Sequence, residues 1–410
     1  MLTDAYAEEL RAVGRDAGLD RVGIASAEPF DSTRRLLEER KAAGLAGSMQ
    51  FTYRNPARAT DPSATLPGVR SLVVGARRYD GGGATPVPPG PPDRPTARVA
   101  RYATRDHYGD LRAGLAAVAD HLSADGWTTR VVLDDNGLVD RAAAHRAGLG
   151  WYGKNANVLV PGIGSWVVLG SVLTDAPLPP ATAVVADGCA SCRRCLDGCP
   201  TGAIIAPGVV DARRCLAWLV QAEGVFPVEH RVALGDRIYG CDDCQEVCPP
   251  SSRTATTSSP GRPAGDRPEG AAEPAVTAEP ADASARVDLL DLLAADDATL
   301  LARHGRWYIP RREPRYLRRN ALVALGNAAS LDQPGVVVAL ERAMADGDPL
   351  VRAHAVWAAR RQGHRPLPAA ILADPDPLVR AEVERAEVER ATVERVTSDP
   401  GPAEPDRSCR

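Results

Sequence analysis

Eight of the nine cysteines lie between Cys189 and Cys248, and this stretch constrains the chain more than any other. It opens with a C-x2-C-x2-C-x3-C-P run and closes with a C-x2-C-x3-C-P run. Two residues between thiolates let one turn direct successive sulfurs at one [4Fe–4S] cluster, while the cysteine before proline ligates the other cluster. The spacing therefore assigns one cluster to Cys189, Cys192, Cys195 and Cys248, and the second to Cys199, Cys215, Cys241 and Cys244.

Two other uses of cysteine explain the pattern less well. Structural zinc sites use C-x2-C pairs, but two zinc sites do not account for a triple C-x2-C-x2-C followed by x3-C-P. Disulfides need an oxidising compartment, and the N-terminal sequence MLTDAYAEELRAVGRDAG has no apolar signal core. We therefore expect reduced thiols in a cytoplasmic protein. An insertion at 216–240 separates Cys215 from Cys241, and we expect it to serve a partner surface.

Length and charge set further limits. A chain of 410 residues should hold two or three domains with ample core. No apolar run approaches the roughly 20 residues that cross a bilayer, so we expect no membrane span. A net charge of -4 excludes a globally basic nucleic-acid binder, although a local basic patch could still bind RNA.

The first part of the chain alternates helical and strand patterns, which predicts an α/β domain over residues 1–180. Hydrophobic periodicity predicts helices at 3–18, 32–43, 107–124 and 141–147, and strands at 21–25, 71–75, 129–133, around Val158 and at 166–173. Asp31 or Ser32 is the expected cap of the second helix. Residues 181–250 then form a bacterial ferredoxin-like domain with two [4Fe–4S] clusters.

The amino-acid composition changes twice in the C-terminal part of the chain. Residues 251–285 are rich in Ser, Thr, Pro, Ala and Gly, and such a segment cannot bury enough apolar surface to order itself, so we predict a disordered linker. In 286–395 the sequence D-P-L-V-R-A occurs at Asp348 and again at Asp376. An Asp cap before a proline starts a helix, and the shared spacing predicts HEAT-like helical repeats. Residues 396–410, with Cys409, are predicted to be a disordered tail.

Outside the cysteines, Asp134 is the leading candidate for chemistry. It follows a predicted strand, where α/β folds place reactive groups, and a partly buried carboxyl could hold a proton. The alternative is that Asp134 or Asp135 only caps the next helix. Three glycines in 148–153 do not match a dinucleotide-binding motif, and we expect them to let the backbone approach a bulky ligand. Lys154 would suit a phosphate or a carbonyl, or it is simply solvated.

Several segments carry a resemblance to a known family. They are L-D-D-N-G-L-V-D-R from Leu133, A-G-L-G-W-Y-G-K-N from Ala147, R-Y-A-T-R-D-H-Y from Arg101, the cysteine set ending G-C-D-D-C-Q-E-V-C-P, and L-R-R-N-A-L-V-A-L-G-N from Leu317. Together they resemble the epoxyqueuosine reductase family over about residues 1–380. The resemblance implies an N-terminal domain that binds cobalamin, two [4Fe–4S] clusters that pass electrons to cobalt, and reduction of the epoxide of epoxyqueuosine at the tRNA wobble position.

The same resemblance implies roles for single residues. Asp134 aligns with the family's proton donor, and Tyr102 and Lys154 are candidate cofactor contacts. A tyrosine packed in the core is the competing interpretation of Tyr102. The sequence departs from the family pattern at Gly137, at Ala217, at Pro250-Ser251 and in the order of His107-Tyr108, which affects the cofactor and substrate contacts more than the clusters.

A basic segment offers a site for tRNA. Seven arginines lie between Arg303 and Arg319, interleaved with aromatic residues, and only Glu313 opposes them in the sequence. Guanidinium groups bind phosphates and aromatic faces stack on unpaired bases, as anticodon loops require. An arginine-rich solvated helix face is the alternative. The expected tRNA contacts are Arg311, Arg312, Arg315, Arg318 and Arg319.

The sequence thus predicts a monomeric, cobalamin-dependent iron–sulfur reductase that acts on a modified base in tRNA and takes electrons from an external donor. Two other functions share the cysteine pattern. One is a cobalamin-dependent, reductive dehalogenase-like enzyme for a small molecule. The other is an electron-transfer ferredoxin module whose helical repeats bind a protein partner. Binding of an anticodon stem-loop separates the first two, and cobalamin uptake separates both enzymes from the third.

Overall fold

The computed structural model describes residues 2–79, 89–252 and 285–385. The chain divides into two compact units. The first contains Met1–Pro88, Val99–Ala222 and Tyr239–Ala285, and the second contains Pro89–Arg98, Glu223–Ile238 and Arg286–Arg410. Most of the predicted linker, from 253 to 284, and the predicted tail with Cys409 lie outside the described residues.

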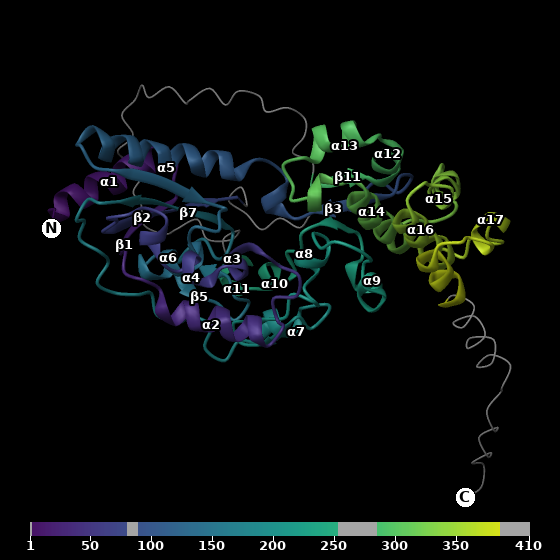
Figure 1. Cartoon of the computed structure of the whole chain (residues 1–410), viewed down its shortest axis with the longest axis horizontal. Helices are drawn as coiled ribbons and strands as arrows, with labels where there is room; N and C mark the ends of the chain where they lie inside the picture. The colour runs from purple at the N-terminus through teal and green to yellow at the C-terminus, as the bar shows by residue number, and fades with distance from the viewer. Residues whose placement is uncertain (1, 80–88, 253–284, 386–410) are drawn as a thin grey trace, which may run out of the picture. The chain divides into compact units, whose positions relative to one another are not determined.

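The first unit is built on a four-stranded sheet of order β1-β2-β7-β4 (Figure 1). Its strands are β1 (Arg21–Ser26), β2 (Ser71–Arg78), β4 (Thr129–Leu133) and β7 (Val167–Thr174). Each neighbouring pair is antiparallel, and at the centre Val73 of β2 aligns with Ile24 on one side and Val172 on the other. Strands and helices alternate in sequence as predicted, but the sheet has no parallel pair, so the rule that places reactive groups at parallel strand ends does not apply here.

Helices cover both faces of this sheet. The first face packs against α1 (Asp4–Asp16) and α5 (His107–Ala124), which run side by side in Figure 1 and contribute Leu10, Leu111 and Leu115 to a buried cluster with Ile24 and Val73. The second face packs against α6 (Asp140–Arg146), through Ala143 and its neighbours. Side chains that alternate along each strand therefore enter two separate cores.

Short helices complete the outer layer of the first unit. They are α2 (Asp31–Ala42), α3 (Phe51–Arg54), α4 (Pro56–Ala59), and the 3-10 turns η1 (Pro62–Ala64) and η2 (Arg101–Ala103). The predicted cap of α2 is wrong. Phe30 occupies the N-cap position without a side-chain hydrogen bond, and Asp31 is already the first helical residue. There its carboxylate interacts favourably with the positive end of the helix dipole.

The cysteine-rich part of the first unit consists of short elements that hold the chain in tight turns. They are the hairpin β5 (Trp151–Tyr152) and β6 (Val158–Leu159), α7 (Arg194–Asp197), the hairpin β8 (Ile204–Ala206) and β9 (Val209–Val210), α8 (Leu216–Leu219), α10 (Asp243–Glu246) and α11 (Pro249–Ser252). Ser251 is fully buried in α11, so the ordered structure continues past the predicted start of the linker.

The second unit is mainly helical. It contains α9 (Val228–Leu234), α12 (Leu289–Ala294), α13 (Asp297–His304), the turn η4 (Pro310–Arg312), α14 (Arg315–Ala328), α15 (Val336–Met344), α16 (Pro349–Arg361) and α17 (Ala369–Leu372). A three-stranded sheet has the order β10-β3-β11, with β3 (Thr96–Val99), β10 (Arg237–Tyr239) and β11 (Arg286–Asp288). Helix α16 packs against both α14 and α15. Within the described ranges no helix has the length and apolar composition to cross a membrane.

The insertion between Cys215 and Cys241 contributes to this helical unit. Phe226, Arg231 and Leu234 are fully buried, and the Phe226 backbone N–H donates to His354 Nε2 over 3.1 Å. The Arg231 guanidinium pairs with Glu382 at 2.8 Å. These large side chains therefore pack within the protein itself, and the partner surface expected for this insertion stays a prediction for its exposed residues, such as Val225 and Val232.

Candidate functional site

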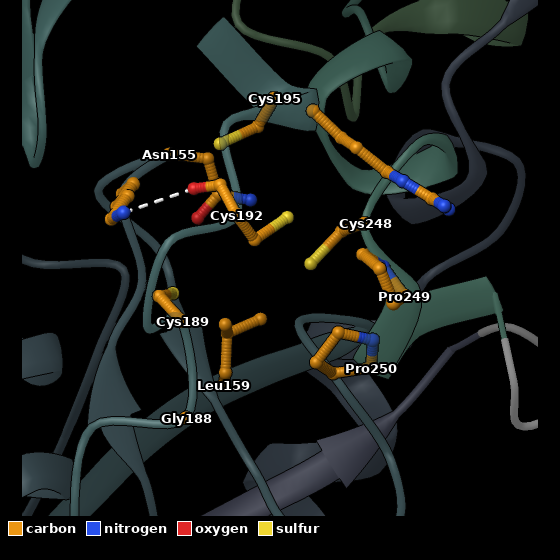
Figure 2. A pocket seen from close by; sticks show the side chains of 11 residues that line it. Asn155, Leu159, Gly188, Cys189, Cys192, Cys195, Cys248, Pro249 and Pro250 are labelled. Atoms are coloured by element: carbon orange, nitrogen blue, oxygen red, sulfur yellow. Dashed lines mark hydrogen bonds between the residues drawn. The ribbon is translucent and has the colours of Figure 1, made fainter.

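Four cysteines from two distant stretches of sequence surround one cavity in the first unit. Cys189, Cys192 and Cys195 meet Cys248 around a space of about 170 Å³ (Figure 2). The hydrophobic side of the site is formed by Trp151 and Leu159 of the β5–β6 hairpin, which pack against Cys248. None of the eight described cysteines forms a disulfide. A cavity bordered by four unpaired thiols fits the ligands that a [4Fe–4S] cluster needs.

Local turns direct these thiols toward the cavity. The Cys192 backbone N–H donates to the Cys189 carbonyl at 2.9 Å, which closes the first turn, and Cys195 lies on α7. Cys248 follows α10 and immediately precedes α11, so its proline neighbour begins a new helix. Burial and the neighbouring thiols Cys248 and Cys189 raise the pKa of Cys195.

The other four cysteines also come together. Burial raises the pKa of the Cys244 thiol well above its ordinary value, and Cys241, Cys215 and Cys199 lie close enough to raise it further. The Cys199 sulfur accepts a hydrogen bond from the Ala203 backbone N–H at 3.2 Å. Cys215 is the N-cap of α8, and its backbone carbonyl accepts from the Trp218 and Leu219 N–H groups at 2.9 Å, while its side chain makes no capping hydrogen bond.

Lys154 and Asn155 follow β5 and contact the cysteine loops. The Lys154 ammonium donates to the carbonyls of Ala190 and Cys192 at 2.6 Å and 3.0 Å. The Asn155 side-chain amide donates to the Cys244 carbonyl at 3.3 Å. Lys154 was expected to suit a phosphate or a carbonyl group. The carbonyl groups that it binds here belong to the protein itself. The part played by Asn155 was not anticipated, although its position beside Lys154 in the G-K-N motif is a signal that could have suggested it.

Asp134 directly follows β4 and has a backbone conformation that few residues adopt. Its φ is 49°, in the left-handed region that aspartate tolerates better than most side chains. Asp135 Oδ1 accepts from the Gly137 backbone N–H at 2.7 Å and closes a turn. Helix α6 begins only at Asp140, with Val139 as its N-cap, so neither Asp134 nor Asp135 caps it. The capping alternative is therefore wrong for both residues.

The surroundings of the Asp134 carboxyl shift its pKa upward. Asp134 is exposed at the surface, yet partial burial of its carboxyl raises the pKa, and the like charge of Asp135 raises it further. Arg112 has the opposite, smaller effect. Asp140 lies nearby, and burial followed by the charge of Asp134 raises its pKa well above the ordinary value. The role of Asp140 was not predicted from the sequence, in which this residue is the first of the D-R pair that begins α6.

Tyr102 is a packing residue in this structure. Its ring lies 6.3 Å from that of Tyr239, its hydroxyl accepts from Gln221 at 3.5 Å, and burial raises its pKa well above the ordinary value. Tyr102 is partly exposed, whereas His107 is buried, and burial lowers the pKa of His107 to about 4. These contacts favour the interpretation of Tyr102 as a core residue.

The glycines near Lys154 serve the fold, and the expected close approach to a bulky ligand is wrong for them. A Cβ atom at Gly150 would lie 2.3 Å from the Leu159 carbonyl oxygen, and one at Gly153 would lie 2.8 Å from a Leu159 methyl group. At Gly148, where φ is +70°, the nearest atom would be the Ala183 carbonyl oxygen. The protein's own atoms, backbone oxygens beside Gly148 and Gly150 and a side chain beside Gly153, fill the space that glycine leaves open.

The basic segment of the second unit separates into exposed and buried arginines. Arg311 and Arg312 are exposed on the η4 turn, and Arg315 is partly exposed. Arg318 is bound to Asp297 at 2.6 Å and to the Ala295 carbonyl. Arg319 is fully buried, donates to Asn320 Oδ1 and the Gly224 carbonyl, and has a pKa lowered by burial to about 9.

Charges from elsewhere in the unit also oppose this segment. Arg311 pairs with Glu223 at 2.9 Å, and Arg315 pairs with Glu313 at 2.6 Å and Asp348 at 3.5 Å. Glu313 is the only acidic residue within this segment of the sequence, but in the folded protein Glu223 and Asp348 also pair with its arginines. Among the interleaved aromatics, Trp307 and Tyr316 are buried, while Tyr308 is 45% exposed. The surface available to a nucleic acid therefore includes Tyr308, Arg311 and Arg312, with Arg315 partly exposed, and Arg303 and Arg306 are exposed as well.

Comparison with known proteins matches both the cysteine-rich region and the whole chain. The sequence family described as 4Fe-4S double cluster binding domain matches residues 188–251, which contain all eight cysteines discussed above. An epoxyqueuosine reductase of Xanthomonas campestris is 35% identical over 370 residues, which is 88% of this chain and 97% of that protein. A solved epoxyqueuosine reductase with an epoxyqueuosine-modified tRNA-Tyr stem loop has a TM-score of 0.78 and 27% identity, over 93% of this chain and 98% of that one.

A further solved structure bears on Asp134. It is an epoxyqueuosine reductase of Bacillus subtilis whose aspartate catalytic loop is swung out of the active site, and it matches with a TM-score of 0.77 and 27% identity over 93% of this chain and 98% of that one. The sequence identity, the share of the chain that it covers and the mixed α/β fold all indicate the same family. The region 188–251 binds two [4Fe–4S] clusters, and the chain belongs to the epoxyqueuosine reductase family of oxidoreductases.

Proposed function

We propose that this protein reduces the epoxide of epoxyqueuosine at the tRNA wobble position to queuosine. Electrons from an external donor pass through the two [4Fe–4S] clusters to cobalamin, and Asp134 supplies a proton. The observation that carries the proposal is that one compact unit contains both groups of four cysteines together with Asp134, whose pKa is raised by burial and by Asp135. The matched structure with a modified stem loop supports the choice of substrate.

The residues around Asp134 fit a cofactor with many amide groups. The Asp140 carboxyl has one oxygen that is buried and lacks a hydrogen-bond partner within the described part of the chain. The raised pKa of Asp140 makes that carboxyl a donor or an acceptor, and both suit the amide side chains of cobalamin. When bound, cobalamin supplies a strongly reducing cobalt centre that can attack an epoxide carbon. The chain's own residues then have to bind the substrate and manage the proton.

Asp134 would protonate the oxygen that leaves the epoxide carbon. An alkoxide in a poorly solvated site is unfavourable, so a positioned acid lowers the barrier to C–O cleavage. The raised pKa increases the fraction of Asp134 that still holds a proton near neutral pH. Its strained φ of 49° fits a residue on a loop with two arrangements, as in the Bacillus subtilis relative.

The tRNA would contact the exposed basic group Tyr308, Arg311 and Arg312, with Arg315 beside it. Two guanidinium groups on one turn can bind successive phosphates, and an exposed tyrosine ring can stack on an unpaired base. Arg318 and Arg319 would support this surface from within, since their guanidinium groups already bind protein oxygens. All five expected arginines thus belong to the proposed tRNA site, with Arg318 and Arg319 supporting the exposed ones.

The proposed division of labour follows the predicted domains. Residues 1–180 would bind cobalamin, 181–250 would form the ferredoxin-like cluster domain, and 286–395 would form HEAT-like repeats that hold the tRNA. Two equivalent caps support a repeat, because the Leu350 and Leu378 backbone N–H groups donate to Asp348 and Asp376 at the same distance of 2.8 Å. One chain carries every proposed group, so we infer a monomer that acts on tRNA in the cytoplasm.

The decisive experiment measures the product. The full chain is reconstituted with iron, sulfide and cobalamin under anaerobic conditions, supplied with a chemical reductant and epoxyqueuosine-containing tRNA, and the nucleosides are analysed. We expect queuosine from the native protein and a loss of about 10²–10⁴-fold in turnover for Asp134→Asn, the range that general acids contribute. Asp120→Asn, on the exposed face of α5, is the matched control. Full turnover by Asp134→Asn would remove it from the acid role.

A further inference from the structure

Lys154 places a positive charge beside one of the two cluster sites. It lines the cavity bordered by Cys189, Cys192, Cys195 and Cys248, and its ammonium donates to the carbonyls of Ala190 and Cys192. Figure 2 shows Cys192 beside the other three cysteines that border this cavity. Ala190 has a φ of 42°, an unfavourable conformation for alanine. The lysine therefore stabilises a strained turn between the first two thiols.

The next residue reaches the other cluster. Asn155 is 5% exposed, and its amide donates to the Cys244 carbonyl at 3.3 Å while its Oδ1 accepts from the Asn157 backbone N–H at 3.2 Å. Consecutive side chains from the loop between β5 and β6 thus bind the backbone of both cysteine groups. The first contact carries a charge and the second does not.

No carboxylate neutralises that charge. Within the described residues Lys154 makes no ion pair, and the other charged residue that lines the cavity, Arg194, is also positive. The second cysteine group has charges of both signs nearby, because Asp242 acts on Cys244 and Arg141 acts on Cys215. Four thiolates around a [4Fe–4S] core carry a net negative charge that increases by one on reduction. Nearby cations therefore favour the reduced form, and net charge is one of the factors that set the potential.

We propose that Lys154 is a positioning residue that raises the reduction potential of the cluster held by Cys189, Cys192, Cys195 and Cys248 relative to the other cluster. Each reduction is a one-electron step in which the cluster gains the electron and the external reductant loses it. The lysine exchanges no proton in this step and acts through its fixed charge and its two hydrogen bonds. The inference rests on the ligand assignment and is independent of the tRNA substrate.

The test is a redox titration of the anaerobically reconstituted full chain with dithionite, followed by electron paramagnetic resonance, with iron counted in the same samples. Lys154→Gln retains N–H donors but loses the charge, and Lys154→Arg retains both. The chain has one other lysine, Lys41, which is exposed on α2, so Lys41→Gln is a matched control.

We expect Lys154→Gln to hold about eight irons per chain and to shift one of the two midpoint potentials to more negative values. The expected shift is at least a tenfold change in the reduction equilibrium, about 59 mV for one electron. Lys154→Arg and Lys41→Gln should leave both potentials in place. Two unchanged potentials in Lys154→Gln would overturn the inference. If Lys154→Gln bound less iron, the iron content of Lys154→Met and Lys154→Arg would decide. A purely structural role predicts that Lys154→Arg also binds less iron, because arginine differs in shape from lysine.

Discussion

At the residue scale, the pH dependence of turnover should report the Asp134 carboxyl. A general acid must be protonated, so turnover should fall as the pH rises through the Asp134 pKa, which burial and Asp135 raise above its ordinary value. Asp135→Asn removes the like charge but keeps an oxygen for the Gly137 N–H. The Asp134 pKa should then decrease, and the falling limb of the pH profile should move to lower pH. Asp120→Asn should leave the profile unchanged, and an unshifted limb in Asp135→Asn would contradict this account.

Burial also separates two arginines that look alike in the sequence. Arg319→Met should reduce the free energy of unfolding by about 1–3 kcal/mol, because it removes the guanidinium that donates to the buried Asn320 side chain and to the Gly224 carbonyl. Arg311→Ala, on the exposed η4 turn, should change stability little. It should instead lower tRNA affinity and reduce the slope of log affinity against log salt by about 0.7–0.9. Denaturant titrations and salt-dependent binding of a stem-loop check both, and a reversed pattern would refute the proposed surface.

At the scale of elements, the repeated Asp caps should stabilise their helices to a similar extent. Asp348 accepts from the Leu350 backbone N–H at the start of α16, and Asp376 does the same for Leu378. Replacing an Asp cap by alanine typically costs about 1 kcal/mol. We expect Asp348→Ala to lower the unfolding free energy by this amount or more, because Asp348 also pairs with Arg315. Asp348→Asn, which keeps the capping oxygen, should recover most of the loss in the same denaturation experiment.

Elements with strong local signals were predictable from the sequence. The bounds of α5 and β4 agree with the prediction residue for residue, since Asp106 caps α5 and both elements carry clear periodicity. The antiparallel sheet order was not predictable, because it depends on pairings between distant strands such as β2 and β7. The glycines of 148–153 were misinterpreted for the same reason. The backbone that fills the space beside Gly150 comes from β6.

At the scale of the whole molecule, cluster assembly should depend on residues far apart in the chain. Cys248→Ser removes a thiol that closes the cavity opposite Cys189, Cys192 and Cys195. We expect iron to fall from about eight to about four per chain, because each [4Fe–4S] cluster needs its four ligands. Iron and sulfide analysis after anaerobic reconstitution measures this. Cys409→Ser, near the C-terminus, should retain the full iron content, and retention by Cys248→Ser would refute the ligand assignment.

The same distance in sequence explains which parts of the site could be predicted. The grouping of the cysteines follows from covalent spacing and a known geometric rule, and the structure brings the same two sets of thiols together. The contacts of Lys154 could not be predicted, because its carbonyl partners at Ala190 and Cys192 become neighbours only after folding. The burial of Arg319 could not be predicted either, because Gly224, whose carbonyl it binds, belongs to the distant insertion between Cys215 and Cys241.

Gly164 shows how a defect in metal loading could arise at a position with no sulfur. A Cβ atom there would lie 2.5 Å from the Ser251 Cα, and Gly164 has a φ of +75° that disfavours other residues. Ser251 is fully buried, bonds to Ser165 and Trp166, and lies three residues beyond Cys248. Any side chain at 164 would therefore displace the segment around Ser251, and Cys248 with it. Inherited variation at this glycine would therefore mimic the loss of a ligand.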